Sequence, residues 1–426
     1  MKKTLAMIAA VFMLVLLAVG GSILGNQTGV GINSGALIAS SAAEAVSGAT
    51  PKTTATDSAS GAASSANAVA TGGSALDVAS LFTERDLEQT ADLDGAVSIA
   101  LTSGEDVTID AEGVYVISGE ASDVTISVDA GDDAKVQLVL DGVTITNADT
   151  PVIEIVSADK AFITLSGSRN HLEVRGDFET ASMDAVIASK SDLTLNGTGS
   201  LEIVAANGDG VKSNDDLKVT GGTYTIAAID ALKANDSIRI CGGDFTITAG
   251  KDALHSENKE DTSLGYIYIS GASLDISAQD DGIQGNSIVQ IDSGVINIHT
   301  SSEGIESTHV QINGGEIDIY ATDDGINAAQ KSSNNILLEI NGGVIDINMA
   351  SGDTDALDSN GDLSISNSTL TITANSAFDY NGSGALTGGT VTVNGQVVTQ
   401  LTQSQMGGRM NGDHGGKPNR MNPMHP

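Results

Sequence analysis

The sequence predicts an all-β protein, a right-handed parallel β-helix (solenoid) with about 21–22 residues per coil. The first observation is a recurring unit, an acidic residue followed by Gly or Ala and then by Ile, Leu or Val. The unit occurs at Asp209-Gly210-Val211, Asp230-Ala231-Leu232, Asp252-Ala253-Leu254, Asp281-Gly282-Ile283, Glu303-Gly304-Ile305, Asp324-Gly325-Ile326 and Asp355-Ala356-Leu357. The second is the spacing of the acids: 21 (209 to 230), 22 (to 252), 29 (to 281), 22 (to 303), 21 (to 324) and 31 (to 355), a repeat length typical of a solenoid. The third is strict apolar–polar alternation between glycine corners, with no persistent helical period.

The N-terminal region has the composition of an export segment and a spacer. Lys2-Lys3 precede an apolar run from Leu5 to Leu24, so residues 1–25 are predicted to be an export signal or an uncleaved membrane anchor. Residues 26–78 are rich in Ala, Ser, Thr and Gly, which is typical of a disordered linker. The protein is therefore expected to be secreted or displayed on the cell surface.

Residues 79–400 are predicted to form the β-helix domain. Alternation begins after Asp94, and from Ala185 onward each coil has a strand on the acidic unit, a second strand, a corner such as Gly242-Gly243 or Gly314-Gly315, and a third strand. Equivalent residues then stack ~4.8 Å apart, so about a dozen coils form one rod with an inner apolar ladder. Residues 401–426 are rich in Gly, Met and Asn and are predicted to be a disordered tail.

The composition limits the partners. Of 426 residues, 55 are acidic and 19 basic, giving a net charge of −36, which excludes nucleic acid because phosphate binding needs a basic surface. Cation binding, or solubility outside a cell, fits this charge. The single cysteine, Cys241, excludes an internal disulfide framework and is read as a residue flanking a turn. We expect a monomer.

Stacking the coils turns the acidic units into a column of carboxylates. Two unit charges ~4.8 Å apart repel by roughly 3.5 kcal/mol at an effective dielectric constant near 20, so the column needs a counter-charge, raised pKa values or side chains turned into water. Ca²⁺ meets the need with oxygen ligands in adaptable geometry. The alternative is that each Asp caps its own turn by accepting backbone N–H bonds. The predicted calcium ligands, with Asp280 and Asp281 leading, are Asp209, Asp230, Asp252, Asp280, Asp281, Glu303, Asp323, Asp324 and Asp355.

A second column should point outward from the same strands, three residues after each acid. Its first members, Lys212, Lys233, His255 and Gln284, are the predicted carbohydrate-binding residues, and the later members become acidic at Glu306 and Asp358. Ordinary solvated surface is the alternative. The two longer coils carry polar insertions, Glu257–Ser263 and Gln330–Asn335, which should bulge from one edge of the rod and frame a binding face or be tolerated surface loops.

The segments Val128–Asn147, Pro151–Ile155 and Ser157–Lys160, together with the repeated acidic units, resemble a known family. It is the family of secreted carbohydrate-binding proteins with a polysaccharide-lyase-like β-helix. The resemblance covers roughly residues 94–398 and implies a right-handed parallel β-helix, bound calcium, and affinity for cellulose or pectin-like acidic polysaccharide. It places the calcium role on the Asp residues of the repeated units; Glu303 and Ser376 depart from that pattern.

Two functions follow as hypotheses. The first is an extracellular, calcium-binding carbohydrate-binding protein without catalytic residues. The second is a calcium-dependent, pectate-type polysaccharide lyase, in which a cation acidifies the proton next to the uronate carboxylate and Lys212 or Lys233 removes it. The column contains no arginine, and a ladder of carboxylates does not single out the pair that a hydrolase needs.

Overall fold

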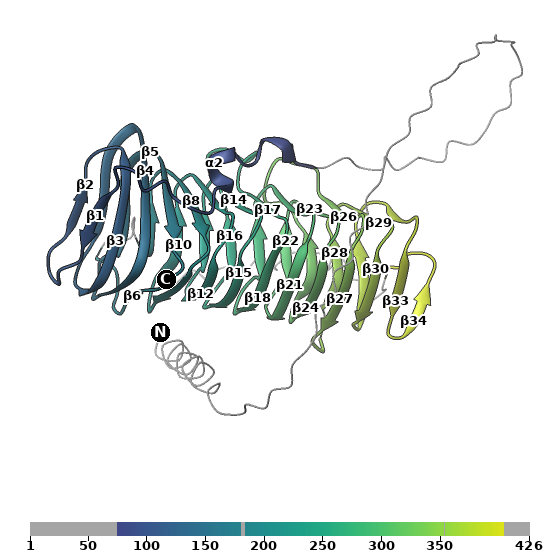
Figure 1. The fold of residues 1–426 in the computed structure, drawn as a ribbon. Coiled ribbons are helices and arrows are strands. Elements are labelled where there is room, and N and C mark those ends of the chain that lie inside the picture. Colours follow the sequence, from purple (N-terminus) through teal and green to yellow (C-terminus); the bar gives the residue numbers. More distant parts are fainter. Residues whose placement is uncertain (1–74, 180–183, 353, 404–426) are drawn as a thin grey trace, which may run out of the picture. The chain divides into compact units, whose positions relative to one another are not determined.

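The computed structural model describes residues 75–179, 184–352 and 354–403. These residues form a parallel β-solenoid of about twelve turns, which confirms the predicted fold class (Figure 1). The predicted export segment, residues 26–74 of the predicted linker, and the predicted tail from residue 404 onward lie outside the described residues. Within the described part, no helix has both the length and the apolar character to span a membrane.

The strands form three ladders, and each strand pairs in parallel with its equivalent in the next coil. The first ladder carries the acidic units and contains β2 (Val107–Ile109), β7 (Ala185–Ser189), β10 (Asp209–Ser213), β13 (Leu232–Ala234), β16 (Leu254–Ser256), β19 (Ile283–Gly285), β22 (Ile305–Ser307), β25 (Asp324–Ala328), β28 (Asp355–Ser359) and β31 (Ser376–Tyr380). The second contains β1 (Val97–Ala100), β8 (Asp192–Gly197), β11 (Asp216–Val219), β14 (Ser237–Ile240), β17 (Tyr266–Ile269), β20 (Ile288–Ile291), β23 (His309–Ile312), β26 (Leu337–Ile340), β29 (Asp362–Ile365) and β32 (Gly384–Leu386).

The third ladder contains β6 (Arg169–Val174), β9 (Ser200–Ala205), β12 (Thr223–Ala228), β15 (Asp244–Ala249), β18 (Ala272–Ala278), β21 (Gly294–Thr300), β24 (Glu316–Ala321), β27 (Val344–Met349), β30 (Thr369–Thr373) and β33 (Thr390–Val393). Near the N-terminal end, β3 (Gly113–Ser122), β4 (Ile126–Asn147) and β5 (Ile153–Leu165) run through corners, so that β4 pairs with β2, β3, β5 and β6. At the other end β34 (Gln396–Val398) folds back antiparallel on β33.

The core is a stack of aliphatic side chains inside the coils. Ile283, Ile305, Ile326 and Leu357 lie opposite one another on successive strands and are fully buried, which confirms the predicted inner ladder. A fully buried aliphatic side chain contributes about 1.5–3 kcal/mol. The repeat therefore adds stability coil by coil, and the buried side chains join into one core that runs from Ile109 to Val391.

The Gly-Gly corners follow from backbone geometry. In Gly314-Gly315 the second glycine has φ +104°, a conformation that L side chains rarely adopt. A Cβ on Gly314 would lie 2.6 Å from the carbonyl oxygen of Asp292 in the preceding coil. The corner thus needs one glycine for its backbone conformation and the other for close stacking.

Residues 75–89, which we call the N-terminal strap, run along the outside of the second ladder; the repeat pattern did not predict this. The strap contains a short 3-10 helix, η1 (Val78–Ser80), and one helical turn, α2 (Glu84–Leu87). Its Ala75 N–H donates to Gln311 Oε1 (2.9 Å), and Arg239 donates to the Leu81 carbonyl oxygen (3.1 Å). The fully buried Asp86 lies 2.5 Å from Lys160 Nζ. These contacts fix the strap across several coils.

Candidate functional site

The acids of the repeated units form one column along the first ladder. Asp324 lies opposite Asp355, and Asp355 lies opposite Ser376. The Oδ1 atom of one acid accepts a hydrogen bond from the backbone N–H of the acid in the next coil. The N···O distances are 3.3 Å (Asp230 to Asp209), 3.3 Å (Asp252 to Asp230), 3.0 Å (Asp281 to Asp252), 3.3 Å (Glu303 to Asp281) and 3.2 Å (Asp355 to Asp324).

This bonding pattern differs from the capping alternative weighed above, in which each Asp would cap its own turn. Here the carboxylates of Asp209, Asp230, Asp252, Asp281 and Asp324 each cap the turn of the following coil, so one oxygen connects neighbouring coils. The second oxygen of each carboxylate remains available for another partner. The column therefore has a structural role and still offers one ligand atom per coil.

The second oxygens contact the outward column, and the partners change along the rod. Lys233 Nζ lies 2.5 Å from Asp230 Oδ2 and 3.4 Å from Asp209 Oδ2. His255 Nδ1 lies 2.5 Å from Asp252 Oδ2. Within the described part of the chain, the side-chain hydrogen bond to Asp281 Oδ2 comes from the neutral amide of Gln284. Along the outward column, the basic side chains that contact these acids thus end at His255.

The pKa values of the acids show where the column lacks counter-charge. Burial, with the nearby carboxylates of Asp252, Glu306 and Asp280, raises the pKa of Asp281 to about 7. Burial, with the charges of Glu306 and Asp281, raises the pKa of Glu303 to about 9. Burial and the repulsion among these carboxylates favour the protonated forms of Asp281 and Glu303, although Lys331 pairs with the neighbouring Glu306.

The same environment extends along the rod. Burial and the carboxylate of Asp358 raise the pKa of Asp324 to about 7. Burial raises the pKa of Asp209 to about 6, and the charge of Lys233 limits the rise. The pKa values are therefore raised most at Asp281, Glu303 and Asp324.

Three groups of side chains bring their ligand atoms within 4.8 Å of one another among the described residues: Asp230, Asp252 and His255; Asp252, Asp280 and Asp281; and Asp281, Glu303 and Glu306. The structure thus brings together Asp230, Asp252, Asp280, Asp281 and Glu303 of the predicted ligand set. Within the described part of the chain, Asp209, Asp323, Asp324 and Asp355 do not join such a group. Sequence reasoning did not nominate Glu306 or His255 as ligands, although both lie three residues after a nominated acid.

The outward column exists as predicted. Lys212, Lys233, His255 and Gln284 lie opposite one another on successive strands, and Glu306 follows. Lys212, Lys233 and His255 line one groove of about 560 Å³, whereas Gln284 does not. None of the three is a free cation, because Lys212 Nζ also lies 2.6 Å from Asp184 Oδ1. The groove is thus lined by basic side chains that already pair with carboxylates of Asp184, Asp230 and Asp252.

The two polar insertions lie on one edge of the rod, as predicted. Thr262 Oγ1 of the first and Ser333 Oγ of the second are 3.1 Å apart. Glu257, Asn258, Lys259 and Glu260 of the first insertion line the groove. Lys331 of the second insertion contacts the outward column, with Nζ 2.5 Å from Glu306 Oε2. Both insertions therefore frame the site.

Among the tyrosines of the repeat region, Tyr266 is half-buried and Arg239 lies 5.2 Å from the centre of its ring. Tyr224 is buried and stacks on Phe245 at a centroid distance of 4.9 Å. Tyr268 is also buried, and Tyr320 is exposed but lies on the third ladder. Burial raises the pKa of the Cys241 thiol to about 11, so this residue is not a thiolate nucleophile at neutral pH.

Known proteins are similar to this chain in sequence and in structure. A family model described as carbohydrate-binding domain-containing protein matches residues 103–356. A protein of Acetivibrio thermocellus with the same description is 36% identical over 211 residues, covering 48% of this chain and 74% of that protein. A solved structure, described as the polysaccharide lyase-like protein from C. thermocellum in a gadolinium derivative, is 26% identical, covers 71% of this chain and 97% of that one, and has a TM-score of 0.40.

The family model spans more than half of the chain, and the A. thermocellus protein is matched over most of its length. These matches confirm the resemblance to carbohydrate-binding proteins stated from the sequence. The chain belongs to the family of carbohydrate-binding domain-containing proteins.

Proposed function

We propose that this protein is an extracellular, calcium-binding protein that binds cellulose or a pectin-like acidic polysaccharide without catalysing its cleavage. The single observation that carries the proposal is the arrangement of the first ladder. It places carboxylate groups suited to a divalent cation next to a groove lined by lysine and histidine side chains. Family membership supports carbohydrate as the ligand class.

Calcium suits the two all-carboxylate groups. Asp281 belongs to both, with Asp252 and Asp280 on one side and Glu303 and Glu306 on the other. Ca²⁺ takes oxygen ligands, including carboxylates that coordinate through one or two oxygens. Its charge would replace the protons that the raised pKa values of Asp281 and Glu303 imply. The group with His255 suits calcium less well, because a ring nitrogen is a softer ligand.

Acidic polysaccharide is the favoured ligand over cellulose. Near the groove, Tyr224 and Tyr268 are buried and offer a neutral glucan no ring on which to stack. A uronate chain offers carboxylates that can complete the coordination of calcium at Asp281 and meet Lys212 and Lys233 in the groove. The chain would then lie along the rod axis, across successive coils.

Affinity electrophoresis of the full chain on polygalacturonate and on cellulose, with calcium or with a chelator, tests the proposal. We expect retardation on polygalacturonate that requires calcium and that Asp281→Asn weakens at least tenfold. Asp318→Asn, which removes an exposed acid on the third ladder, is the matched control and should behave as wild type. Absence of retardation on both polymers with calcium present would contradict the proposal.

The lyase alternative requires an unprotonated base near the cation site. Burial lowers the pKa of Lys233, but the charges of Asp209 and Asp230 outweigh burial and raise that pKa overall. Lys233 is therefore a poor base near neutral pH. Incubation with polygalacturonate and calcium should produce no ultraviolet absorbance of unsaturated uronides, and a steady rise in that absorbance would establish the lyase instead.

A further inference from the structure

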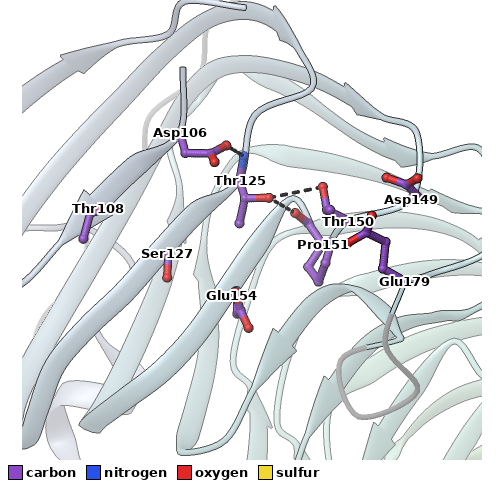
Figure 2. A pocket seen from close by; sticks show the side chains of 9 residues that line it. All are labelled: Asp106, Thr108, Thr125, Ser127, Asp149, Thr150, Pro151, Glu154 and Glu179. Carbon is purple, nitrogen blue, oxygen red and sulfur yellow. Dashed lines mark hydrogen bonds between the residues drawn. The ribbon is translucent and has the colours of Figure 1, made fainter. Parts of the chain in front are cut away.

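A hollow of about 390 Å³ is lined by residues between Asp106 and Glu179, none of which belongs to the acidic column. Figure 2 shows the side chains that line it. Thr108, Ser127 and Glu154 form its floor, and they are consecutive members of the outward column. Glu154 lies opposite Ala188, which lies opposite Lys212 at the start of the groove. The hollow and the groove therefore lie on one column of aligned positions, which we call the track, and the buried Ala188 separates them.

The walls of the hollow are fixed by hydrogen bonds. Thr125 donates its backbone N–H to Asp106 Oδ1 (2.8 Å) and its hydroxyl to the Pro151 carbonyl oxygen (2.8 Å), as Figure 2 shows. The Thr125 hydroxyl also lies 3.3 Å from Thr150 Oγ1. A pre-organised wall reduces the entropy lost when a ligand binds.

The floor, in contrast, has free hydrogen-bonding capacity. Within the described residues, the side chains of Thr108, Ser127 and Glu154 make no hydrogen bond or ion pair. In the groove farther along the track, Lys212 and Lys233 are both ion-paired. Thr108, Ser127 and Glu154 can thus bond a ligand without breaking an existing contact.

The lining determines which ligand fits. Among the described residues that line the hollow, the titratable side chains are all acidic, Asp106, Asp149, Glu154 and Glu179, and none is Lys, Arg or His. This charge repels uronate carboxylates. Across the described residues, these carboxylates do not converge in any three-ligand group within 4.8 Å, so they do not form a ready-made cation site. Separated carboxylates and hydroxyls instead suit a ligand with many hydroxyl donors, because a bond to a carboxylate is stronger than one between neutral groups.

We propose that this hollow binds pyranose units that carry no negative charge. The inference rests on the proposed function, since it extends the same polysaccharide track. The volume lies within the range of small-ligand sites, about 300–1,000 Å³. A pyranose ring is about as long as the ~4.8 Å spacing between coils, so successive rings can meet Thr108, Ser127 and Glu154 in turn. The track would then combine a calcium-independent part with a calcium-dependent part.

Isothermal titration of the full chain tests this inference. Neutral cello-oligosaccharide, a glucosamine oligomer and oligogalacturonate are titrated in chelator and in calcium. We expect the neutral or the amino sugar to bind in chelator and expect Glu154→Ala and Ser127→Val each to weaken that binding at least tenfold. Glu105→Gln, which alters an exposed acid outside the lining, is the matched control and should bind as wild type.

The outcomes separate this inference from the proposed function. Calcium-dependent binding of oligogalacturonate that survives Glu154→Ala, together with loss of neutral or amino sugar binding, supports the inference and shows that the variant is folded. No binding of either sugar in chelator, or binding that both variants leave unchanged, overturns it and leaves the proposed function standing. Fewer calcium ions bound by Glu154→Ala would also overturn it, because the hollow would then be a cation site. Failure of oligogalacturonate alone refutes the proposed function alone.

Discussion

The substitution Asp281→Asn distinguishes two effects of this carboxylate: its repulsion of neighbouring carboxylates and its proposed binding of calcium. Asn keeps an oxygen that can accept the Glu303 N–H, whose distance to Asp281 Oδ1 is 3.3 Å. Its amide nitrogen replaces the oxygen that now faces Gln284, and the Gln284 amide can turn to present its own oxygen. The change therefore removes one buried negative charge and preserves the bond between coils.

The expected effect follows from the raised pKa. The pKa of Asp281 rises from 3.8 to about 7, so the folded state binds more protons than the unfolded state between these pH values. The free energy of unfolding therefore falls as the pH rises through this window, and the full cost applies above pH 7. A tenfold change in proton affinity is worth about 1.4 kcal/mol, which sets an upper limit of about 4 kcal/mol. Because Glu303 and Glu306 take part in the same repulsion and relieve part of it by binding protons, we expect a smaller effect. Asp281→Asn should stabilise the calcium-free protein by about 1–3 kcal/mol at pH 8.

Thermal unfolding followed by circular dichroism checks this at pH 4 and pH 8, in chelator and in calcium. In chelator the variant should melt higher than wild type at pH 8, and the difference should shrink at pH 4, where the native carboxyl is protonated. In calcium the order should reverse, because a bound ion stabilises only the protein that retains its ligands. A variant that melts lower than wild type in chelator at pH 8 would refute the electrostatic reasoning.

Two further predictions concern stability. Asp86→Ala should lower the free energy of unfolding by about 3–5 kcal/mol, because it leaves Lys160 buried without its partner. Chemical denaturation measures this loss, with the exposed Asp77→Ala as the control. A loss smaller than that of the control would contradict the stabilising role of the strap. Gly304→Ala should cost about 1–3 kcal/mol through overpacking, since its Cβ would lie 2.4 Å from the Gly325 carbonyl oxygen. Gly167→Ala, with open space around its Cβ, should melt as wild type, and equal melting of the two variants would show that stacking at Gly304 is not tight.

The repeat carried enough information to predict the three ladders, the inner column of Ile283 and Ile305, and the stacking of Asp324 on Asp355. Each of these depends on one residue type at one position of a coil, and a period near 21 residues fixes which positions coincide. The same logic placed Lys212 and Lys233 on one outward column.

Features that depend on residues outside the repeat were not predictable in this way. The strap joins Asp86 to Lys160, and no period relates these two positions. The hollow depends on Thr108, Ser127 and Glu154, which precede the explicit repeat and share no residue type with Lys212 in the same column. The side chain that contacts the second oxygen of each acid was not predicted either. That contact depends on whether the residue three positions later is a cation, as at Lys233, or an amide, as at Gln284.

The change from Lys233 to Gln284 explains why calcium is expected in the middle of the rod and not along its whole length. Asp230 has a lysine 2.5 Å away, and Asp252 has a histidine at the same distance. A calcium ion at Asp230 would have to compete with Lys233. At Asp281 the protein supplies a neutral amide, while Asp280 and Glu303 add charge from both sides. Lys331, the nearby cation, pairs with Glu306. Replacing Gln284 with Lys should therefore place a cation directly beside Asp281, lower calcium affinity and stabilise the calcium-free protein. Calcium titration followed by calorimetry measures both effects, and unchanged calcium affinity in Gln284→Lys would place the ion elsewhere.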